Sequence, residues 1–97
     1  MKGGLNNMMT FQEWKKEQLK DPIVRLEYEK IQLEKMLAKK LAETRIQQNI
    51  TQQELADKVG VKQSHLSRFE NGKHAPSLEF IQRVASGLGK QLHIEFR

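Results

Sequence analysis

The chain has 97 residues, of which 17 are Lys or Arg and 12 are Asp or Glu, and its formal net charge is +5. The absence of Cys excludes a disulfide framework and a thiolate metal site, and it suits a reducing compartment. The sequence contains no run of about 18 apolar residues and no secretory leader pattern, so we expect a cytoplasmic protein without a membrane partner.

The positive charge is distributed unevenly along the chain. Residues 1–34 contain six basic and six acidic side chains, whereas residues 35–97 contain eleven basic and six acidic ones. A basic segment beside a neutral one predicts a polyanionic partner for the basic segment and a different role for the neutral one.

Helix signals begin after a start, residues 1–9, that shows no hydrophobic period and that we expect to be disordered. Thr10 and Glu13 have the spacing of a capping box, which predicts the start of a short helix. Asp21-Pro22 predicts a second start, because Asp caps well and Pro at the first helical position has no N–H group to satisfy. Residues 22–48 then form one long helix or two helices with a kink, since the apolar positions change phase along them.

Asn49 predicts a left-handed end to this helical stretch, and two short helices joined by a tight turn follow. Thr51 and Glu54 repeat the capping box, and Gly60 is suited to end the helix that they begin. Residues 63–70 form the next short helix, which Asn71-Gly72 closes. Two short helices joined by a Gly-containing turn are the unit that offers its second helix to the major groove of DNA.

The C-terminal part changes its period. Ser77 caps a further helix that ends at Gly89, and residues 91–97 alternate between apolar and polar side chains, which predicts a strand. The expected fold is therefore all-α: a five-helix helix-turn-helix domain over residues 35–90, an N-terminal helical extension over residues 10–34, and a short C-terminal β-strand.

The second short helix keeps a polar face free once Leu66 and Phe69 point to the core. Most side chains of this face can bond base edges or phosphates. They are Lys62, Gln63, Ser64, His65, Ser67 and Arg68. We predict that this face binds DNA, and the alternative is an ordinary solvated face.

Residues 50–72, ITQQELADKVGVKQSHLSRFENG, resemble the helix-turn-helix of the Cro/C1-type repressors, and the resemblance covers about residues 37–89. With its N-terminal FQEWKKEQLKDPIVRLEYE and its ending GLGKQLHIEF, the chain is similar, more narrowly, to HigA-type antitoxins of toxin–antitoxin operons. It departs from the repressor pattern at Lys62, where Ser or Thr is the usual helix cap, so we expect a weaker cap there. It also departs at Gly87, where Ala is common.

The resemblance to repressors implies roles for single residues. The base-facing residues would be Gln63, Ser64 and Arg68. The phosphate-holding residues would be Gln52, Asn71 and Lys73. The chemistry agrees, because Gln can pair with adenine and Arg with guanine through two hydrogen bonds. The resemblance also implies an ion pair between Arg45 and Glu70, and it leaves His65 either a DNA contact or a surface residue without a special role.

The resemblance to HigA-type antitoxins implies that residues 10–34 bind a toxin, a small basic, ribosome-dependent mRNA-cleaving enzyme of the HigB type. This segment concentrates aromatic and aliphatic side chains, which dominate interface energies. The expected toxin-contacting residues are Phe11, Trp14, Ile23, Val24, Glu27, Tyr28 and Ile31. The alternative is that Trp14 and Tyr28 pack against the first helix of the DNA-binding domain.

A palindromic operator requires a dimer whose recognition helices lie about 34 Å apart. The C-terminal strand suggests how the dimer forms, because pairing with the same strand of a second subunit would bury Leu92, Ile94 and Phe96. The alternative is that the strand packs on its own domain.

We therefore expect a homodimeric antitoxin and autorepressor that requires no cofactor and no metal, and the alternative is a free-standing Cro/C1-type repressor without a toxin. An enzyme is disfavoured, because the sequence has no metal-hydrolase, nucleophile-elbow or phosphate-loop motif. His65, His74 and His93 are widely separated, and Glu27 and Glu29 do not share a helix face.

Overall fold

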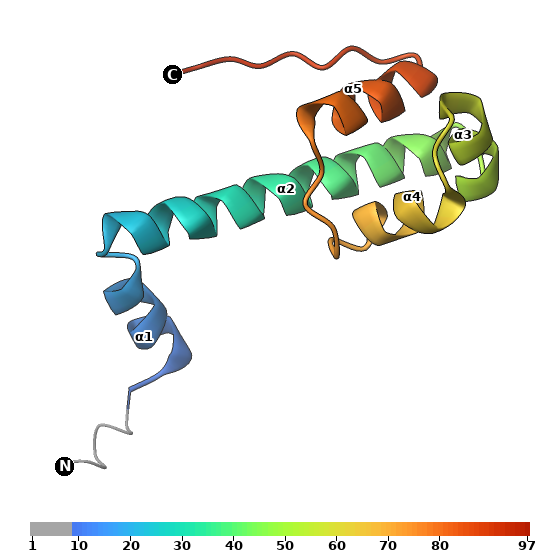
Figure 1. Ribbon diagram of the computed structural model, residues 1–97. Helices are drawn as coiled ribbons and strands as arrows, with labels where there is room; N and C mark the ends of the chain where they lie inside the picture. Colours follow the sequence, from blue (N-terminus) through green and yellow to red (C-terminus); the bar gives the residue numbers. More distant parts are fainter. Residues whose placement is uncertain (1–8) are drawn as a thin grey trace. The chain divides into compact units, whose positions relative to one another are not determined.

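The computed structural model describes residues 9–97, so the disordered start expected at residues 1–9 lies outside the described residues except for Met9. Helices are the only regular secondary structure of the described residues (Figure 1). They are α1 (Phe11–Gln18), α2 (Pro22–Gln47), α3 (Gln52–Val59), α4 (Gln63–Glu70) and α5 (Leu78–Gly87). The chain divides into two compact units, the first ending at Leu33 and the second spanning Glu34–Arg97. None of the described helices is long and apolar enough to cross a membrane.

Helix α1 begins with the predicted capping box. The backbone N–H of Glu13 donates to Oγ1 of Thr10 at 3.1 Å, and the N–H of Thr10 donates to the Glu13 carboxylate at 3.0 Å. The backbone bond from Thr10, followed by the bond to its side chain, lowers the pKa of Glu13, because both favour the charged carboxylate. Asp21 starts α2 similarly, since its carboxylate accepts the N–H of Ile23 at 2.9 Å.

Helix α2 is one continuous helix from Pro22 to Gln47, which resolves the alternative of one helix or two. Its change of hydrophobic phase does not require a kink, because its buried residues, Ala38 and Leu41, both lie in the C-terminal half. The chain then turns at Asn49, whose φ of 59° confirms the predicted left-handed stop.

The core of the second unit brings α3, α4 and α5 together with the C-terminal half of α2. Its buried side chains are Ala38, Leu41, Leu55, Ala56, Leu66, Phe69, Phe80, Ile81, Val84, Ala85 and Leu88. Burial of each large apolar side chain contributes about 1.5–3 kcal/mol. The described residues form five helices, as expected. Of these, α3, α4, α5 and the C-terminal half of α2 build this unit, and α1 lies in the first unit.

Gly87 is required by close packing between α3 and α5. A Cβ at this position would overlap Cγ1 of Val59 and lie 3.0 Å from Cδ1 of Leu55. The departure from the Ala of the resembling repressors therefore allows these two helices to approach closely. The fully buried Leu55 and the half-buried Val59 occupy the space that a methyl group at position 87 would need.

The prediction of a C-terminal strand is wrong. Residues 90–97 form no regular secondary structure, and no strand occurs in the described part of the chain. An alternating pattern makes a strand only when a second extended segment pairs with its backbone, and helices supply none. Leu92 packs partly against the core, whereas Ile94 is 56% and Phe96 is 95% exposed.

Candidate DNA-binding surface

Helices α3 and α4 are joined by the tight turn that the sequence predicts. Thr51 and Glu54 cap α3 reciprocally, with hydrogen bonds of 2.9 and 3.0 Å. The helix ends at Gly60, whose φ of 75° lies in the left-handed region and whose N–H donates to the carbonyl of Ala56 at 2.9 Å. The next helix starts only three residues later, at Gln63, so a short connection and a shared core fix the two helices relative to each other.

Side-chain hydrogen bonds connect the start of α3 to both ends of α4. The amide of Gln63 donates to Oε1 of Gln52 at 2.7 Å, and the amide of Gln52 donates to Oε1 of Glu70 at 2.8 Å. Sequence reasoning placed Gln52 and Gln63 in separate roles and missed this direct contact. These hydrogen bonds orient the Gln63 amide at the N-terminal end of α4, which is the end with which a recognition helix meets base edges.

The predicted ion pair between Arg45 and Glu70 is confirmed. Nε and Nη2 of Arg45 donate to the two carboxylate oxygens of Glu70 at 2.7 and 3.0 Å, and Nη1 donates to the carbonyl of Ile50 at 2.6 Å. The desolvation of such a pair offsets much of its attraction, so it fixes the geometry more than it adds stability. It joins the end of α2 to the end of α4.

Lys62 occupies the N-cap position of α4 and makes no capping hydrogen bond through its side chain. This agrees with the weaker cap predicted from its departure from Ser or Thr. The first N–H groups of α4 therefore have no side-chain acceptor, and a cation stands beside them. Both features favour an anion at this helix start.

The remaining predicted DNA contacts lie on α4 itself and in the loop that follows it. Ser64 and Arg68 are exposed and Ser67 is half-buried, as a surface that meets a partner requires. Asn71 and Lys73 are exposed in the loop that follows, where Gly72 has a φ of 70° and the N–H of Lys73 donates to the carbonyl of Arg68 at 2.9 Å. The predicted base-facing and phosphate-holding residues thus lie on α4 and the loop after it, except Gln52, which begins α3.

His65 differs from its neighbours, because its ring points into the protein. Its centroid lies 4.5 Å from those of both His74 and Phe80, and its Nε2 is buried without a hydrogen-bond partner among the described residues. Burial, followed by the charges of His74 and Arg68, lowers the pKa of His65. The ring therefore packs as a neutral group against α5 and the loop before it, and sequence spacing gives no signal of this cluster.

The first unit presents apolar side chains to solvent. Phe11 and Trp14 lie one turn apart on α1, with ring centroids separated by 5.9 Å, and both are more than half exposed. Ile23 and Ile31 are exposed on α2. Tyr28 is partly covered by Lys15, whose Nζ lies 4.5 Å from the centre of the tyrosine ring. Val24 is half-buried and Glu27 is exposed.

Residues 9–97 hold no group of three or more His, Cys, Asp or Glu side chains that could bind a metal ion. His65 and His74 do meet, but they do so edge to face and over a phenylalanine ring.

Comparison with known proteins agrees with this geometry. Residues 41–94, more than half of the chain, match the model of a helix-turn-helix family. The chain is 40% identical over 55 residues to an HTH-type transcriptional regulator of Methanothermobacter thermautotrophicus, in a match that spans 57% of this chain and 78% of that protein. It is 40% identical over 58 residues to an HTH-type transcriptional regulator of Haemophilus influenzae, covering 60% of this chain and 59% of that protein.

A third similar protein is named an antitoxin and not a transcriptional regulator. The antitoxin HicB of Escherichia coli K12 is 39% identical over 49 residues, which are 50% of this chain and 36% of HicB. The chain thus spans about a third of that antitoxin.

Proposed function

The chain belongs to the helix-turn-helix family of transcriptional regulators, and from this membership we propose that it represses its own promoter by binding a palindromic operator. The observation that carries the proposal is the hydrogen-bonded chain from Arg45 through Glu70 and Gln52 to Gln63. This chain holds the start of α4 in one orientation and leaves the polar face of the helix exposed. Preorganised donors and acceptors of this kind are what base recognition needs.

The individual contacts follow from this orientation. The residues that contact base edges are Gln63, Ser64 and Arg68. Arg68 recognises guanine through two hydrogen bonds donated by its guanidinium group. The DNA phosphates are bound by Gln52, Asn71, Lys73 and Lys62, the cationic residue at the N-cap of α4. Ser67 borders this surface. His65 contributes by packing rather than by contact with DNA, since its ring is directed at Phe80.

A dimer is part of the proposal, because a palindrome presents two half-sites one helical turn apart. Ile94 and Phe96 at the C-terminus are exposed apolar side chains, and contact between two subunits would remove them from water. Leu92 already packs partly on its own core, so it serves to anchor the tail that carries the other two.

A second function, antitoxin activity, is supported by two observations. One of the similar proteins is named an antitoxin, and the first unit exposes Phe11, Trp14 and Ile23 although none of them is needed for the DNA-binding core. The partner would be a basic, mRNA-cleaving toxin of the HigB type, complementary to the acidic side chains of this unit. Those side chains are Glu13, Glu17, Asp21, Glu27 and Glu29.

The alternative is a free-standing repressor without a toxin partner. It is favoured by the two other similar proteins, which are named transcriptional regulators. In that case the exposed apolar residues of the first unit would have a partner of another kind.

Two measurements test the proposal. Footprinting on the promoter of the chain's own operon should show protection of two half-sites related by a dyad, and an unprotected promoter would contradict autorepression.

Co-expression of a toxin encoded beside the chain's own gene tests the second function. The toxin is expressed with the full chain, with a chain beginning at Lys35, and with the variant Trp14→Ala plus Tyr28→Ala. Full neutralisation by the shortened chain would show that residues 10–34 are not the inhibitory element.

A further inference from the structure

A small pocket lies where the C-terminal end of α4 meets α2. It has a volume of about 200 Å³ and is lined by Lys35, Ala38, Lys39, Glu70, Asn71 and Gly72. Two of these residues, Lys35 and Lys39, belong to no function described so far. They stand one turn apart on α2, and side chains four residues apart share a helix face.

The lining of the pocket carries a net positive charge, because it contains two lysines and one carboxylate. Glu70 is already bonded to Arg45 and Gln52 through short hydrogen bonds, so its charge is balanced within the protein. Neither Lys35 nor Lys39 forms an ion pair with any residue from 9 to 97. The ammonium groups of Lys35 and Lys39 therefore remain available to an anionic ligand.

Lys35 is placed at the end of α4 by packing. Its Cγ lies 3.8 Å from the position that a Cβ on Gly72 would take, so the aliphatic stem runs directly beside that glycine. The long methylene chain can rest on the protein while the ammonium group stays in water. Lys35 therefore lines the same pocket as Asn71, the residue that follows α4.

The position of the pocket relative to bound DNA follows from the length of α4. A recognition helix meets base edges with its N-terminal residues, and the 8 residues of α4 extend about 12 Å from there at 1.5 Å per residue. The major groove is itself about 12 Å wide. The C-terminal end of α4, with the pocket, therefore lies beside the sugar–phosphate backbone that borders the groove.

We propose that Lys35 and Lys39, together with Asn71, form an additional phosphate-binding site that binds the DNA backbone outside the major groove. The ligand is a phosphodiester oxygen, and the site carries no sequence preference. This inference rests on the proposed DNA binding. It adds two lysines of helix α2 to the phosphate contacts proposed above, which already include Asn71. The Arg45–Glu70 pair makes the new site rigid with respect to α4.

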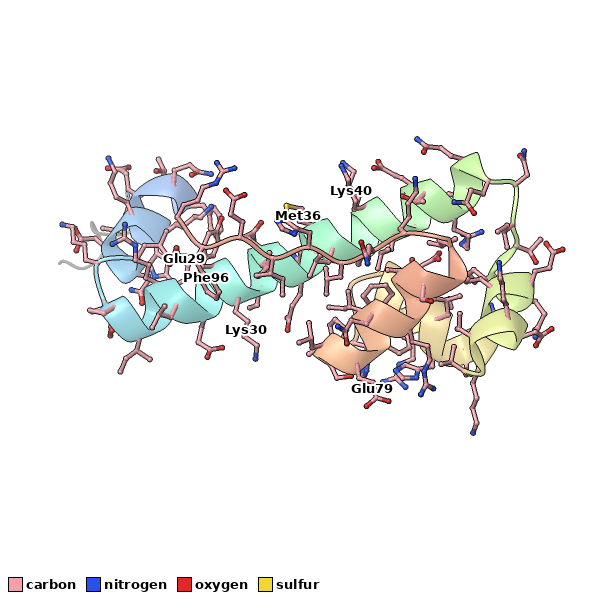
Figure 2. All side chains as sticks on the ribbon, turned by 90° about the horizontal axis from the view of Figure 1, so that it is seen from above. Glu29, Lys30, Met36, Lys40, Glu79 and Phe96 are labelled. Atoms are coloured by element: carbon pink, nitrogen blue, oxygen red, sulfur yellow. The ribbon has the colours of Figure 1, made fainter. Side chains whose placement is uncertain are left out.

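The test is a comparison of two double variants of the full chain. Lys35→Gln with Lys39→Gln removes the proposed site, and Lys30→Gln with Lys40→Gln removes the same charge from the same helix. Lys30 and Lys40 project from α2 into solvent (Figure 2) and do not line the pocket. Successive residues rotate by about 100° around a helix, so Lys40 lies well away from the face that Lys35 and Lys39 share.

Affinity for a short random-sequence DNA duplex and for a duplex of the chain's own promoter is measured over a range of salt concentrations. The slope of log affinity against log salt should become shallower by about 0.9 for each phosphate that the variant no longer neutralises. The pocket variant should show this change equally on both duplexes, and the control variant should keep the wild-type slope. All variants should keep the wild-type melting curve in circular dichroism, because the four lysines are exposed.

Equal slopes for the pocket variant and the control variant would overturn the inference. Ethylation of single phosphates gives a second readout: those flanking each half-site should interfere with binding of the wild type and not of the pocket variant. A wild-type chain that binds neither duplex would contradict the proposed function itself. A wild type that binds while the two variants behave alike would contradict only the additional site.

Discussion

Arg45 and Glu70 form a two-point ion pair whose side chains are only 11% and 6% exposed. The pair connects the end of α2 to the end of α4, and Glu70 continues the connection to Gln52 and through it to Gln63. Removal of one partner leaves the other charge buried and uncompensated. The orientation of the recognition helix, α4, therefore depends on both residues.

Glu70→Ala should lower the free energy of unfolding by about 3–5 kcal/mol, because it leaves the Arg45 guanidinium buried without its partner. Urea denaturation followed by circular dichroism measures this decrease. The matched control is Glu79→Ala, which removes the exposed partner of Arg83 and should cost about 0–1 kcal/mol. Equal decreases for the two variants would contradict the structural role of the buried pair.

The stability of the second unit should fall on mild acidification because of His65. Burial, then His74 and Arg68, lower the pKa of His65, so the folded chain binds this proton less readily than the unfolded chain does. The stabilisation is complete above the usual histidine pKa of about 6.5 and is lost as the pH falls below it. The other charged groups that line the same pocket are Lys62, Glu79 and Arg83.

The measurement is the free energy of unfolding between about pH 7.5 and 5.5, a range above the titration of carboxyl groups. His65→Phe keeps a ring against Phe80 and should remove part of the pH dependence. His93→Gln replaces an exposed histidine of the tail and should leave the pH dependence unchanged. If His65→Phe retains the full wild-type dependence, the ring does not carry it.

Gly87→Ala should destabilise the second unit, in contrast to the usual benefit of Ala over Gly in a helix. Overpacking of this kind costs about 1–3 kcal/mol, because a methyl group would overlap Val59. Ser86→Ala, at the exposed neighbouring position, should be neutral or slightly stabilising. Thermal melting compares the two, and a higher melting temperature for Gly87→Ala would contradict the packing between α3 and α5.

Lys62→Ser should stabilise the fold by about 0.5–2 kcal/mol, because the serine hydroxyl can accept an N–H of α4 that now has no side-chain acceptor. The same change should weaken binding to any duplex DNA, since it removes a cation beside the phosphates. Thermal melting and DNA titration measure the two effects. Lys58→Ser, in the last turn of α3, should give no gain in stability.

Features that depend on neighbouring residues could be predicted from the sequence. The capping boxes at Thr10 and Thr51 and the turns at Asn49 and Gly60 involve residues only a few positions apart, and all four are present. The Arg45–Glu70 pair was expected from resemblance, not from spacing.

Features that depend on distant residues could not be predicted in this way. An alternating tail becomes a strand only beside a second extended segment, and residues 9–97 contain none. The inward direction of His65 is decided by the positions of His74 and Phe80 in a later loop and helix. The contact between Gln52 and Gln63 likewise depends on how α3 crosses α4.

The central claim is that the exposed face of α4 reads a DNA sequence, and Arg68→Ala tests it most directly. Affinities for the chain's own promoter and for a random duplex are measured at one salt concentration, with Lys73→Ala as the phosphate-contact control. Arg68→Ala should lower the preference for the promoter by about 1–3 kcal/mol, whereas Lys73→Ala should weaken both duplexes alike. Equal weakening on both duplexes for Arg68→Ala would contradict base recognition by α4.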